Sequence, residues 1–194
     1  MSRIKTAIIG CGRNARELHT PILLRHPEFE VIGTYDLVAD RAESLANVFA
    51  HNGHNCKAFE SREALLASDV EYVVVLTDSH MHTEVAAACL RAGKNVLITK
   101  PWALDSEDAA FIIDEAKKAA RQRGVAILSS LHDLNQALCL GDKFFLLRDG
   151  AVRYAGDESV LTSEVIGDIF DIQSRIITVD GKKVILGGKY YEES

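Results

Sequence analysis

The sequence has no long hydrophobic run, no closely paired cysteines and no cluster of basic residues. A membrane-spanning helix needs about 20 consecutive apolar residues, and no stretch approaches that length. The net charge of −6 at pH 7 argues against a nucleic-acid-binding surface. These absences predict a protein with no membrane span and no nucleic-acid partner.

The cysteines and the first residues indicate in which cellular compartment the protein is expected. Cys11, Cys56, Cys89 and Cys139 are widely spaced and form no C-x-x-C pair, which predicts reduced thiols and a cytoplasmic protein. The first residues, M-S-R-I-K-T, run directly into a predicted strand, so we expect no signal peptide. The segment H-N-G-H-N-C (residues 51–56) has no second ligand cluster to accompany it. We therefore interpret it as a polar surface loop and predict no metal site.

What is present is the composition of a globular protein, with 47% hydrophobic and 26% charged residues in a chain of 194. Predicted strands and helices alternate over the first 150 residues, which is typical of a parallel sheet covered on both faces. The last 35 residues predict a short helix at Ser163–Phe170 and a hairpin turning at Asp180–Gly181. The expected fold class is α/β: a doubly wound, mainly parallel Rossmann-like sheet with a small C-terminal helix and β-hairpin appendage.

The remaining expected elements follow from apolar patterns and their boundaries. Helices are predicted at 14–25, 39–50 and 82–92, with further helices beginning at Ser106 and Asp133. Strands are predicted at 4–9, 29–35, 57–59, 70–77, 95–99, 125–130 and 143–148.

The most informative segment lies in the first forty residues. The apolar strand Ile4–Ile9 leads into G-C-G-R-N-A, and an acid, Asp36, ends the second predicted strand. This order is the dinucleotide-binding fingerprint, with alanine at its third small position. Gly10 permits a tight turn, Gly12 lets a pyrophosphate approach the backbone, and the following helix offers its positive end to the phosphates. The predicted cofactor-binding residues here are Gly10, Cys11, Gly12, Arg13, Asn14, Ala15 and Asp36.

Asp36 also predicts which cofactor is preferred. Its carboxylate is placed to accept the hydroxyls of an adenosine ribose and would repel a 2′-phosphate. The predicted cofactor is therefore NAD. NADP stays open because Arg13 and Arg41 are close in sequence to the fingerprint and the acid.

Two later segments carry a resemblance to a known family. T-D-S-H-M-H (77–82) and A-A-C-L-R-A-G-K-N-V-L-I-T-K-P (87–101) are similar to motifs of the glucose–fructose oxidoreductase / inositol dehydrogenase (Gfo/Idh/MocA) family. The resemblance covers roughly residues 3–125 and implies a nicotinamide-dependent oxidoreductase. It implies that Lys100 is the catalytic lysine, next to substrate and nicotinamide, and that it also contacts the cofactor. Thr77, Ser79 and His82 would line the cofactor side of the pocket.

The chain departs from that family's pattern at two positions. Thr99 replaces the glutamate that precedes the family's catalytic lysine, and Asp78 replaces a proline. Without the glutamate, a solvated surface role for Lys100 stays open. A packing role for His82 stays open as well.

The C-terminal part resembles a different family. Ser129–Gly156 and Glu158–Phe170, within a match of roughly residues 102–187, are similar to the end of an ABC-transporter ATPase of the iron-siderophore and cobalamin importer class. The resemblance places His132 at the switch-loop histidine. No G-x-x-x-x-G-K-[ST] loop and no L-S-G-G motif occur, so we expect no ATP hydrolysis and a structural role for His132.

The two resemblances overlap at Lys100–Asp105, which predicts a chimera. Residues 1–124 are expected to form the Rossmann half, and residues 125–194 to be an ABC-ATPase-like segment that completes the same α/β domain. The sequence leaves open whether the fusion is natural or engineered, and we favour engineered recombination because the join falls where the sequences coincide.

The leading functional hypothesis is a dinucleotide-binding module of oxidoreductase ancestry with weak or no turnover. One alternative is an NAD-dependent oxidoreductase of sugar or polyol type that takes its substrate site from a partner or from the C-terminal hairpin. The others are a folded scaffold with no ligand and an ATPase-derived fragment. Substrate and oligomeric state stay open.

Overall fold

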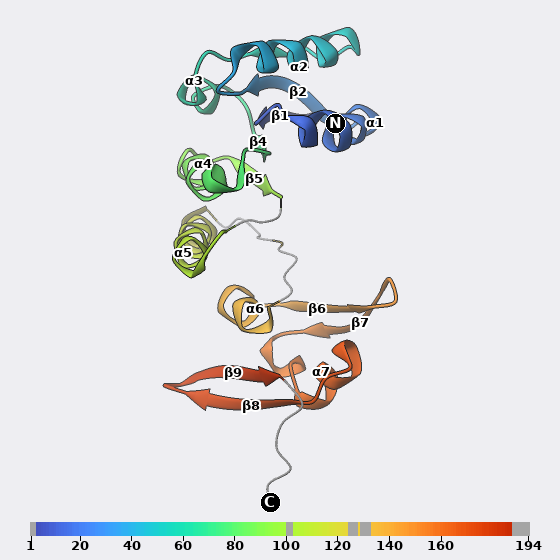
Figure 1. Ribbon diagram of the computed structural model, residues 1–194, viewed down its shortest axis with the longest axis vertical. Coiled ribbons are helices and arrows are strands. Elements are labelled where there is room, and N and C mark those ends of the chain that lie inside the picture. The colour runs from blue at the N-terminus through green and yellow to red at the C-terminus, as the bar shows by residue number, and fades with distance from the viewer. Residues whose placement is uncertain (1–2, 100–102, 124–127, 129–132, 188–194) are drawn as a thin grey trace, which may run out of the picture. The chain divides into compact units, whose positions relative to one another are not determined.

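The computed structural model describes residues 3–99, 103–123, 128 and 133–187 (Figure 1). The chain forms two compact units, Met1–Ile127 and Leu128–Ser194. The prediction that residues 125–194 complete the same α/β domain stays a prediction, because most of the strand expected at 125–130 lies outside the described residues.

The first unit contains a five-stranded sheet in which every pairing is parallel. The strand order is β3-β2-β1-β4-β5, so the order reverses between β1 and β4. This is the arrangement of a doubly wound dinucleotide-binding fold, and it confirms the predicted fold class. The strands are β1 (Ile4–Ile9), β2 (Phe29–Tyr35), β3 (Lys57–Ala58), β4 (Tyr72–Val75) and β5 (Asn95–Ile98).

The helices of this unit alternate with the strands along the chain, as predicted. They are η1 (Ala15–His19), α1 (Thr20–Arg25), α2 (Ala39–His51), α3 (Arg62–Leu66), α4 (Ser79–Arg91) and α5 (Ser106–Arg123). The short helix α3 was not predicted. Its start is fixed by Ser61, whose side chain accepts a hydrogen bond from the Ala64 N–H at 3.1 Å.

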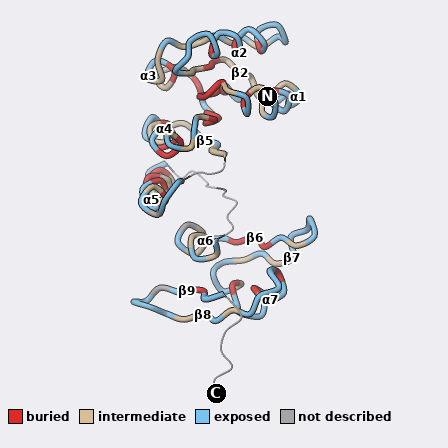
Figure 2. Tube along the Cα trace, in the orientation of Figure 1, coloured by how far each residue is buried: buried red, intermediate tan, exposed pale blue. Residues whose placement is uncertain are grey.

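The central strands β1 and β4 are largely buried on both faces, which explains why they are mostly apolar. On one face, Ile8, Val31 and Val74 pack with residues of α1 and α2, including Leu45 and Phe49. The opposite face is covered by residues of α3 and α4. The core residues there are Ala7, Ile9, Leu65, Val70, Val73, Val75, Val85 and Cys89. Figure 2 shows the buried residues in red along the strands of this unit and on the helix sides that face them.

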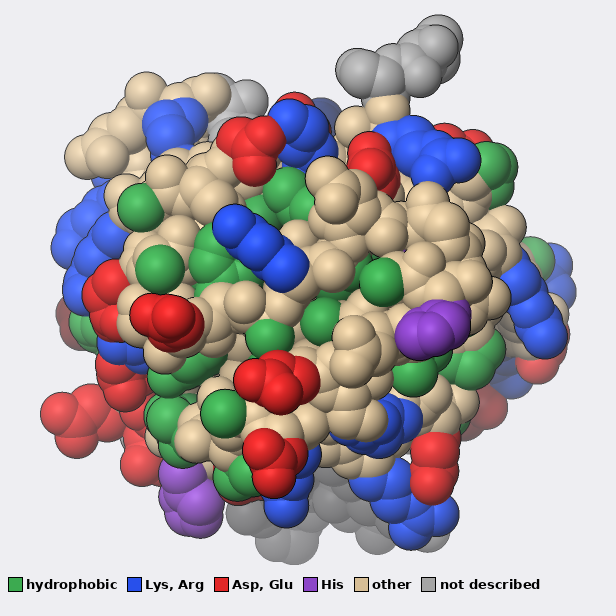
Figure 3. Space-filling view, turned by 90° about the horizontal axis from the view of Figure 1, so that it is seen from above, with side chains coloured by type: hydrophobic (Ala, Val, Ile, Leu, Met, Phe, Trp, Pro, Cys, Tyr) green, Lys and Arg blue, Asp and Glu red, His purple; other side chains and the backbone are tan. Residues whose placement is uncertain are grey.

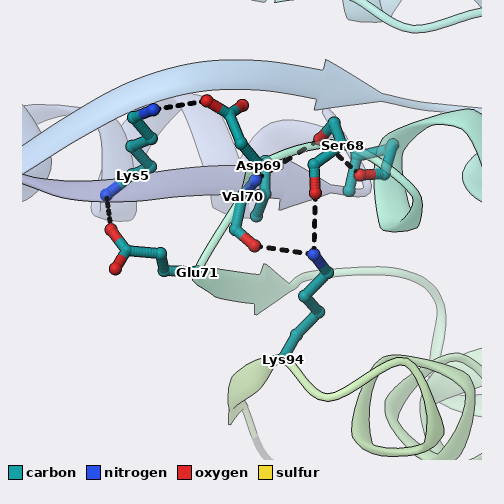
Figure 4. A network of polar contacts seen from close by, with 7 residues as sticks. Lys5, Ser68, Asp69, Val70, Glu71 and Lys94 are labelled. Carbon is teal, nitrogen blue, oxygen red and sulfur yellow. Dashed lines mark hydrogen bonds and ion pairs between the residues drawn. The ribbon is translucent and has the colours of Figure 1, made fainter.

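A network of polar contacts joins β1, β4 and the turn before β5 at the edge of the sheet where these strands begin (Figure 4). Lys5 pairs through its ammonium with Asp69, and its N–H donates to Glu71 at 3.0 Å. The Lys94 ammonium donates to the Ser68 carbonyl at 2.9 Å and to the Val70 carbonyl at 2.8 Å. These contacts hold the N-terminal ends of the strands together. The C-terminal ends of β1 and β4 lie at the opposite edge of the sheet.

The second unit contains two small antiparallel sheets, β6–β7 and β8–β9. Its main core cluster consists of Phe144, Leu146, Leu161 and Ile169. Asp133 caps the first helix by accepting from the Asn135 and Gln136 N–H groups. The elements are α6 (Leu134–Leu140), β6 (Phe144–Arg148), β7 (Ala151–Gly156), η2 (Glu158–Val160), α7 (Ser163–Phe170), β8 (Ser174–Val179) and β9 (Lys182–Gly187).

One expectation for this unit is wrong. The strand predicted at 143–148 was expected to continue a mainly parallel sheet, but β6 pairs antiparallel with β7, which was not predicted. Asp149 and Gly150 both have positive φ, 52° and 74°, and two such residues reverse the chain into a tight hairpin. The predicted turn at Asp180–Gly181 does the same for β8 and β9, with φ of 51° and 76°.

Two further observations concern the surface charges and the helices. On the face drawn in Figure 3, basic and acidic side chains are interspersed. No described helix combines the length and the apolar character that a membrane crossing requires.

Candidate functional site

A cleft with a volume of about 490 Å³ opens in the first unit. It lies at the ends of β1 and β4, where the strand order reverses, and this is the usual ligand position in open α/β sheets. One wall comes from the fingerprint and the residues after β2, and the other from α3, the end of β4 and α4. The lining residues are Ile9, Gly10, Gly12, Tyr35, Asp36, Leu37, Val38, Arg41, Arg62, Glu63, Leu76, Thr77, Asp78, Met81, Glu84 and Val85.

The two fingerprint glycines have different environments. Gly10 has φ +94°, and a Cβ built on it would lie 2.5 Å from the Leu76 carbonyl carbon. Only glycine fits there, because the turn must pass directly against the residues that follow β4. A Cβ built on Gly12 would meet no atom within 4 Å. The space beside Gly12 therefore suits a pyrophosphate that approaches the backbone.

The helix that follows the fingerprint starts at the cleft. The Arg16 N–H bonds to the Gly12 carbonyl at 3.2 Å, so Gly12 is at the start of its first turn. Ala15 is fully buried in the core cluster beneath the helix, as expected for a residue that keeps helix and sheet close. The next turn is a π turn, closed by the Thr20 N–H and hydroxyl on the Ala15 carbonyl. A helix start leaves N–H groups without intrahelical acceptors, which favours an anion there.

Asp36 connects the two halves of this wall. One carboxylate oxygen accepts the Cys11 N–H at 2.7 Å, and the other accepts the Val38 N–H at 2.9 Å. Each oxygen keeps further acceptor capacity, so the carboxylate can fix the loop and still receive ribose hydroxyls. The sequence pattern predicted the second role and missed the first.

Thr77 follows β4 and contributes to the cleft lining. Its hydroxyl oxygen is buried and has no hydrogen-bond partner among the described residues. A buried polar group without a partner costs about 1–3 kcal/mol, so it points to a ligand that completes the site. This hydroxyl, the open space at Gly12 and the Asp36 carboxylate together fit a dinucleotide. A nicotinamide cofactor bound there would supply hydride transfer.

The other predicted cofactor residues have less direct positions. Arg13 forms an ion pair with Glu17 at 2.8 Å, and Asn14 precedes the helix without a side-chain cap bond. Ser79 begins α4, and His82 is buried on the same helix. None of these four residues is part of the cleft lining described above.

Cys11 lies in the fingerprint but is a structural residue. It is fully buried, and burial, with a smaller effect from Asp36, raises the pKa of its thiol to about 12. Its Sγ lies 3.5 Å from the Tyr35 carbonyl, which accepts from the thiol. Cys11 is not part of the cleft lining, and its backbone N–H is bonded to Asp36.

Sequence reasoning named Arg41 but missed two other arginines of the cleft walls, Arg62 and Arg16. Arg62 lines the cleft from the unpredicted helix α3 and pairs with Glu84 at 2.8 Å. This hydrogen bond raises the pKa of the Arg62 guanidinium above its usual value. Arg16 was not predicted either, and its guanidinium donates to the Cys11 carbonyl. No local sequence signal distinguishes these two positions from surface arginines.

Two predicted residues, Lys100 and His132, lie outside the residues that the structure describes.

Within the described ranges, no group of three or more His, Cys, Asp or Glu side chains is placed to hold a metal ion. In the 51–56 segment, the His54 Nδ1 accepts the Val31 N–H at 3.0 Å, and its ring packs on Phe49. This histidine thus joins α2 to β2.

Comparison with known proteins agrees with this geometry. The family model described as "Oxidoreductase family, NAD-binding Rossmann fold" (Gfo/Idh/MocA) matches residues 4–127. The chain belongs to this family. Its first unit is an NAD(P)-binding Rossmann domain.

Two curated relatives in the family are sugar-nucleotide proteins by name. A putative UDP-kanosamine synthase oxidoreductase subunit of Amycolatopsis mediterranei is 36% identical over 127 residues, 66% of this chain and 33% of that protein. The UDP-N-acetylglucosamine 3-dehydrogenase of Acidithiobacillus ferrooxidans is 30% identical over 138 residues, 71% of this chain and 41% of that protein. The chain therefore spans well under half the length of these relatives.

Solved structures show the same family with either cofactor. A 3-ketoreductase from Actinomadura kijaniata, solved with TDP-benzene and NADP, has a TM-score of 0.56 at 30% identity, over 66% of this chain and 38% of that one. GenD2 from gentamicin A biosynthesis, solved with NAD, has a TM-score of 0.56 at 26% identity, over 62% and 33%.

A relative from another family also matches. The phosphonates import ATP-binding protein PhnC 1 of Haloquadratum walsbyi is 33% identical over 87 residues, 44% of this chain and 29% of that protein. By name it is an ATP-binding protein of an import system.

Proposed function

We propose that the chain is a nicotinamide-dinucleotide-binding module of oxidoreductase ancestry, with weak or no turnover of its own. The observation that carries the proposal is the cleft at the β1–β4 reversal, with the Gly12 opening, the Asp36 carboxylate and the unpaired Thr77 hydroxyl on its lining. The pyrophosphate lies at the start of the helix after Gly12. The adenosine ribose bonds to Asp36.

The preferred cofactor is NAD. Asp36 presents negative charge where NADP carries its 2′-phosphate, and like charges within a few ångströms repel. Arg41 also lines this side of the cleft and reduces the preference by attracting the same phosphate. The preference is therefore moderate, and NADPH binds more weakly than NADH.

The test is a titration of the full chain with NADH, NADPH and ATP, repeated on Asp36→Ala. Since Asp36 also accepts two backbone N–H groups, a loss of NADH affinity alone does not separate ribose binding from a loosened loop. The ratio of NADPH to NADH affinity does separate them, because the two cofactors differ only at the 2′ position. We expect the variant to lose most NADH affinity and to shift this ratio toward NADPH.

The matched control is Asp40→Ala, which removes an exposed acid at the start of α2 outside the cleft lining. It is expected to leave NADH affinity within about twofold. If neither nicotinamide cofactor binds at millimolar concentration, the first unit is a scaffold with no ligand. If ATP alone binds and is hydrolysed, the ATPase-derived part governs function and the proposal fails.

A second candidate function is an NAD-dependent oxidoreductase of sugar or polyol type whose substrate site comes from a partner chain. The names of the sugar-nucleotide relatives favour it. In this function Lys100 is the catalytic group, next to substrate and nicotinamide. Turnover of sugars, polyols or nucleotide sugars with NAD, abolished in Lys100→Ala, supports it.

The proposed origin of the chain is a fusion of two nucleotide-binding proteins. The family match ends at residue 127, where the compact units also divide, and a relative of the ABC-ATPase class is present. Residues 125–194 are then the tail of an ATPase, joined to a Rossmann half at residues 1–124. The ATP arm of the titration tests whether this tail retains nucleotide binding.

A further inference from the structure

Arg16 forms a clamp between two elements of the cofactor wall. Its Nε donates to the Cys11 carbonyl at 3.2 Å, inside the fingerprint turn. Its two terminal nitrogens donate to the Ser44 hydroxyl at 3.3 Å and to the Arg41 carbonyl at 3.1 Å, both on α2. One side chain therefore joins the turn that precedes η1 to the first turns of α2.

The clamp and the Asp36 carboxylate hold the two peptide groups that flank the Cys11 Cα. The Cys11 N–H is bonded to Asp36, and the Cys11 carbonyl is bonded to Arg16. The next residue is Gly12, which has open space around it and no side chain to pack. Because glycine is the least restricted residue of the backbone, contacts on both sides of Cys11 are what keep the turn in one conformation.

The shape of the guanidinium suits this role. Three acceptors on two elements are met by a planar fork with fixed donor directions, which a lysine ammonium on its flexible stem does not reproduce. By contrast, the Arg13 side chain, just before η1, is 87% exposed and forms an ion pair with Glu17. The two arginines carry equal charge and lie one and four residues after Gly12, and they differ in what they hold.

We propose that Arg16 is a positioning residue for the dinucleotide: it fixes the Cys11–Gly12 turn against α2 and so aligns the pyrophosphate site with Asp36. The proposal rests on the proposed function and adds a residue to its site. Holding the turn in its bound form before the ligand arrives avoids an ordering cost on binding.

The experiment compares Arg16→Lys, which keeps the charge and loses the fork, with Arg25→Gln, which loses an exposed charge at the end of α1, outside the cleft lining. NADH affinity is measured at a temperature where each variant is folded by circular dichroism. We expect Arg16→Lys to bind NADH about tenfold more weakly, equivalent to about 1.4 kcal/mol. Arg25→Gln is expected to stay within about twofold.

A second readout separates positioning from direct contact with the cofactor. In the ligand-free protein, the exchange rate of the Cys11 amide hydrogen is measured by NMR, with the Val74 amide as a reference in the core. Arg16→Lys is expected to accelerate exchange at Cys11 and to leave Val74 unchanged. Ser44→Ala removes only one arm of the clamp on the exposed side of α2 and gives a smaller acceleration, which keeps the test open should Arg16→Lys fail to fold.

Three results overturn the proposal. Retained NADH affinity in Arg16→Lys shows that charge alone suffices. Weaker binding with unchanged Cys11 exchange shows that Arg16 acts on the cofactor directly, and unchanged Cys11 exchange in Ser44→Ala shows that no clamp operates. If the unaltered protein does not bind NADH, the proposed function fails, whereas the exchange measurement still decides whether Arg16 holds the turn.

Discussion

The two units each contain a hollow of similar volume, about 490 Å³ in the first and about 410 Å³ in the second. Polar groups that line the second hollow already have partners. Tyr154 donates to Asp168 at 3.0 Å, and the Arg148 guanidinium donates to both carboxylate oxygens of Asp171, which lies outside the lining. The first hollow has an unpaired buried hydroxyl on Thr77 and open space at Gly12.

The difference shows that volume does not mark the binding site. A hollow whose charges are already paired gains little from a ligand, because the ligand must compete with existing partners. A cleft with unpaired groups at a strand-order reversal gains those hydrogen bonds on binding. Binding is therefore expected to depend on the first unit and to be independent of the second.

The largest effect is expected at the fingerprint. Gly10→Ala places a Cβ 2.5 Å from the Leu76 backbone at a φ of +94°, and should destabilise the first unit by more than about 3 kcal/mol and abolish NADH binding. Denaturant unfolding and NADH titration measure both. Gly12→Ala is the matched control: its stability should stay within about 0.5 kcal/mol, while its NADH affinity falls at least about tenfold. Equal destabilisation by the two variants contradicts the different roles of the two glycines.

The second prediction tests the independence of the units. Ile166, on α7, is fully buried, so Ile166→Ala should destabilise the second unit by about 2–5 kcal/mol. At a temperature where the variant is folded, NADH affinity should not change. Leu45→Ala, a comparable truncation beneath α2 in the first unit, should weaken NADH binding. Binding lost in Ile166→Ala but kept in Leu45→Ala reverses the assignment of the site.

A smaller effect is expected at Thr77. Thr77→Val keeps the volume and removes the unpaired hydroxyl, so stability should be unchanged or slightly higher. NADH affinity should fall by about three- to tenfold, the value of one hydrogen bond. The control is Thr34→Val, which removes a buried hydroxyl that donates to the Ala42 carbonyl at 2.8 Å and should cost about 1 kcal/mol of stability. A loss of stability in Thr77→Val would mean that its hydroxyl has a partner within the protein.

The smallest effect is a pH dependence confined to the first unit. Burial lowers the pKa of His54 below its ordinary value of 6.5, and its Nδ1 accepts the Val31 N–H. The folded protein therefore favours the neutral ring, so this contribution to stability is present above pH 6.5 and is lost as the pH falls below it. Unfolding free energies measured between about pH 7.5 and 5 should fall more steeply in the unaltered protein than in His54→Gln. A slope that His54→Gln does not reduce rules out this role.

The sequence predicted most of the first unit because its signals are local. The apolar run at Ile4–Ile9, the glycine turn and the acid at the end of β2 each carry a pattern with one structural solution. The short helix α3 was missed because five residues after Ser61 are too few for a periodic pattern.

Other features depend on contacts between segments distant in sequence. Asp36 was assigned to the ribose, but its bond to Cys11 joins residues 25 positions apart. The clamp at Arg16 likewise depends on α2, where its partner Ser44 lies 28 positions further along the chain. In the second unit, the strand at 143–148 was predicted, whereas its antiparallel partner β7 was not.

Hydrogen exchange of the full chain, with and without saturating NADH, tests the central claim most directly. The account predicts slower exchange on binding in the amides around Gly10–Arg16, at Asp36–Val38 and around Thr77, all in the first unit, and unchanged exchange in residues 133–187. Protection in the second unit, or no protection at the fingerprint while NADH is bound, would contradict it.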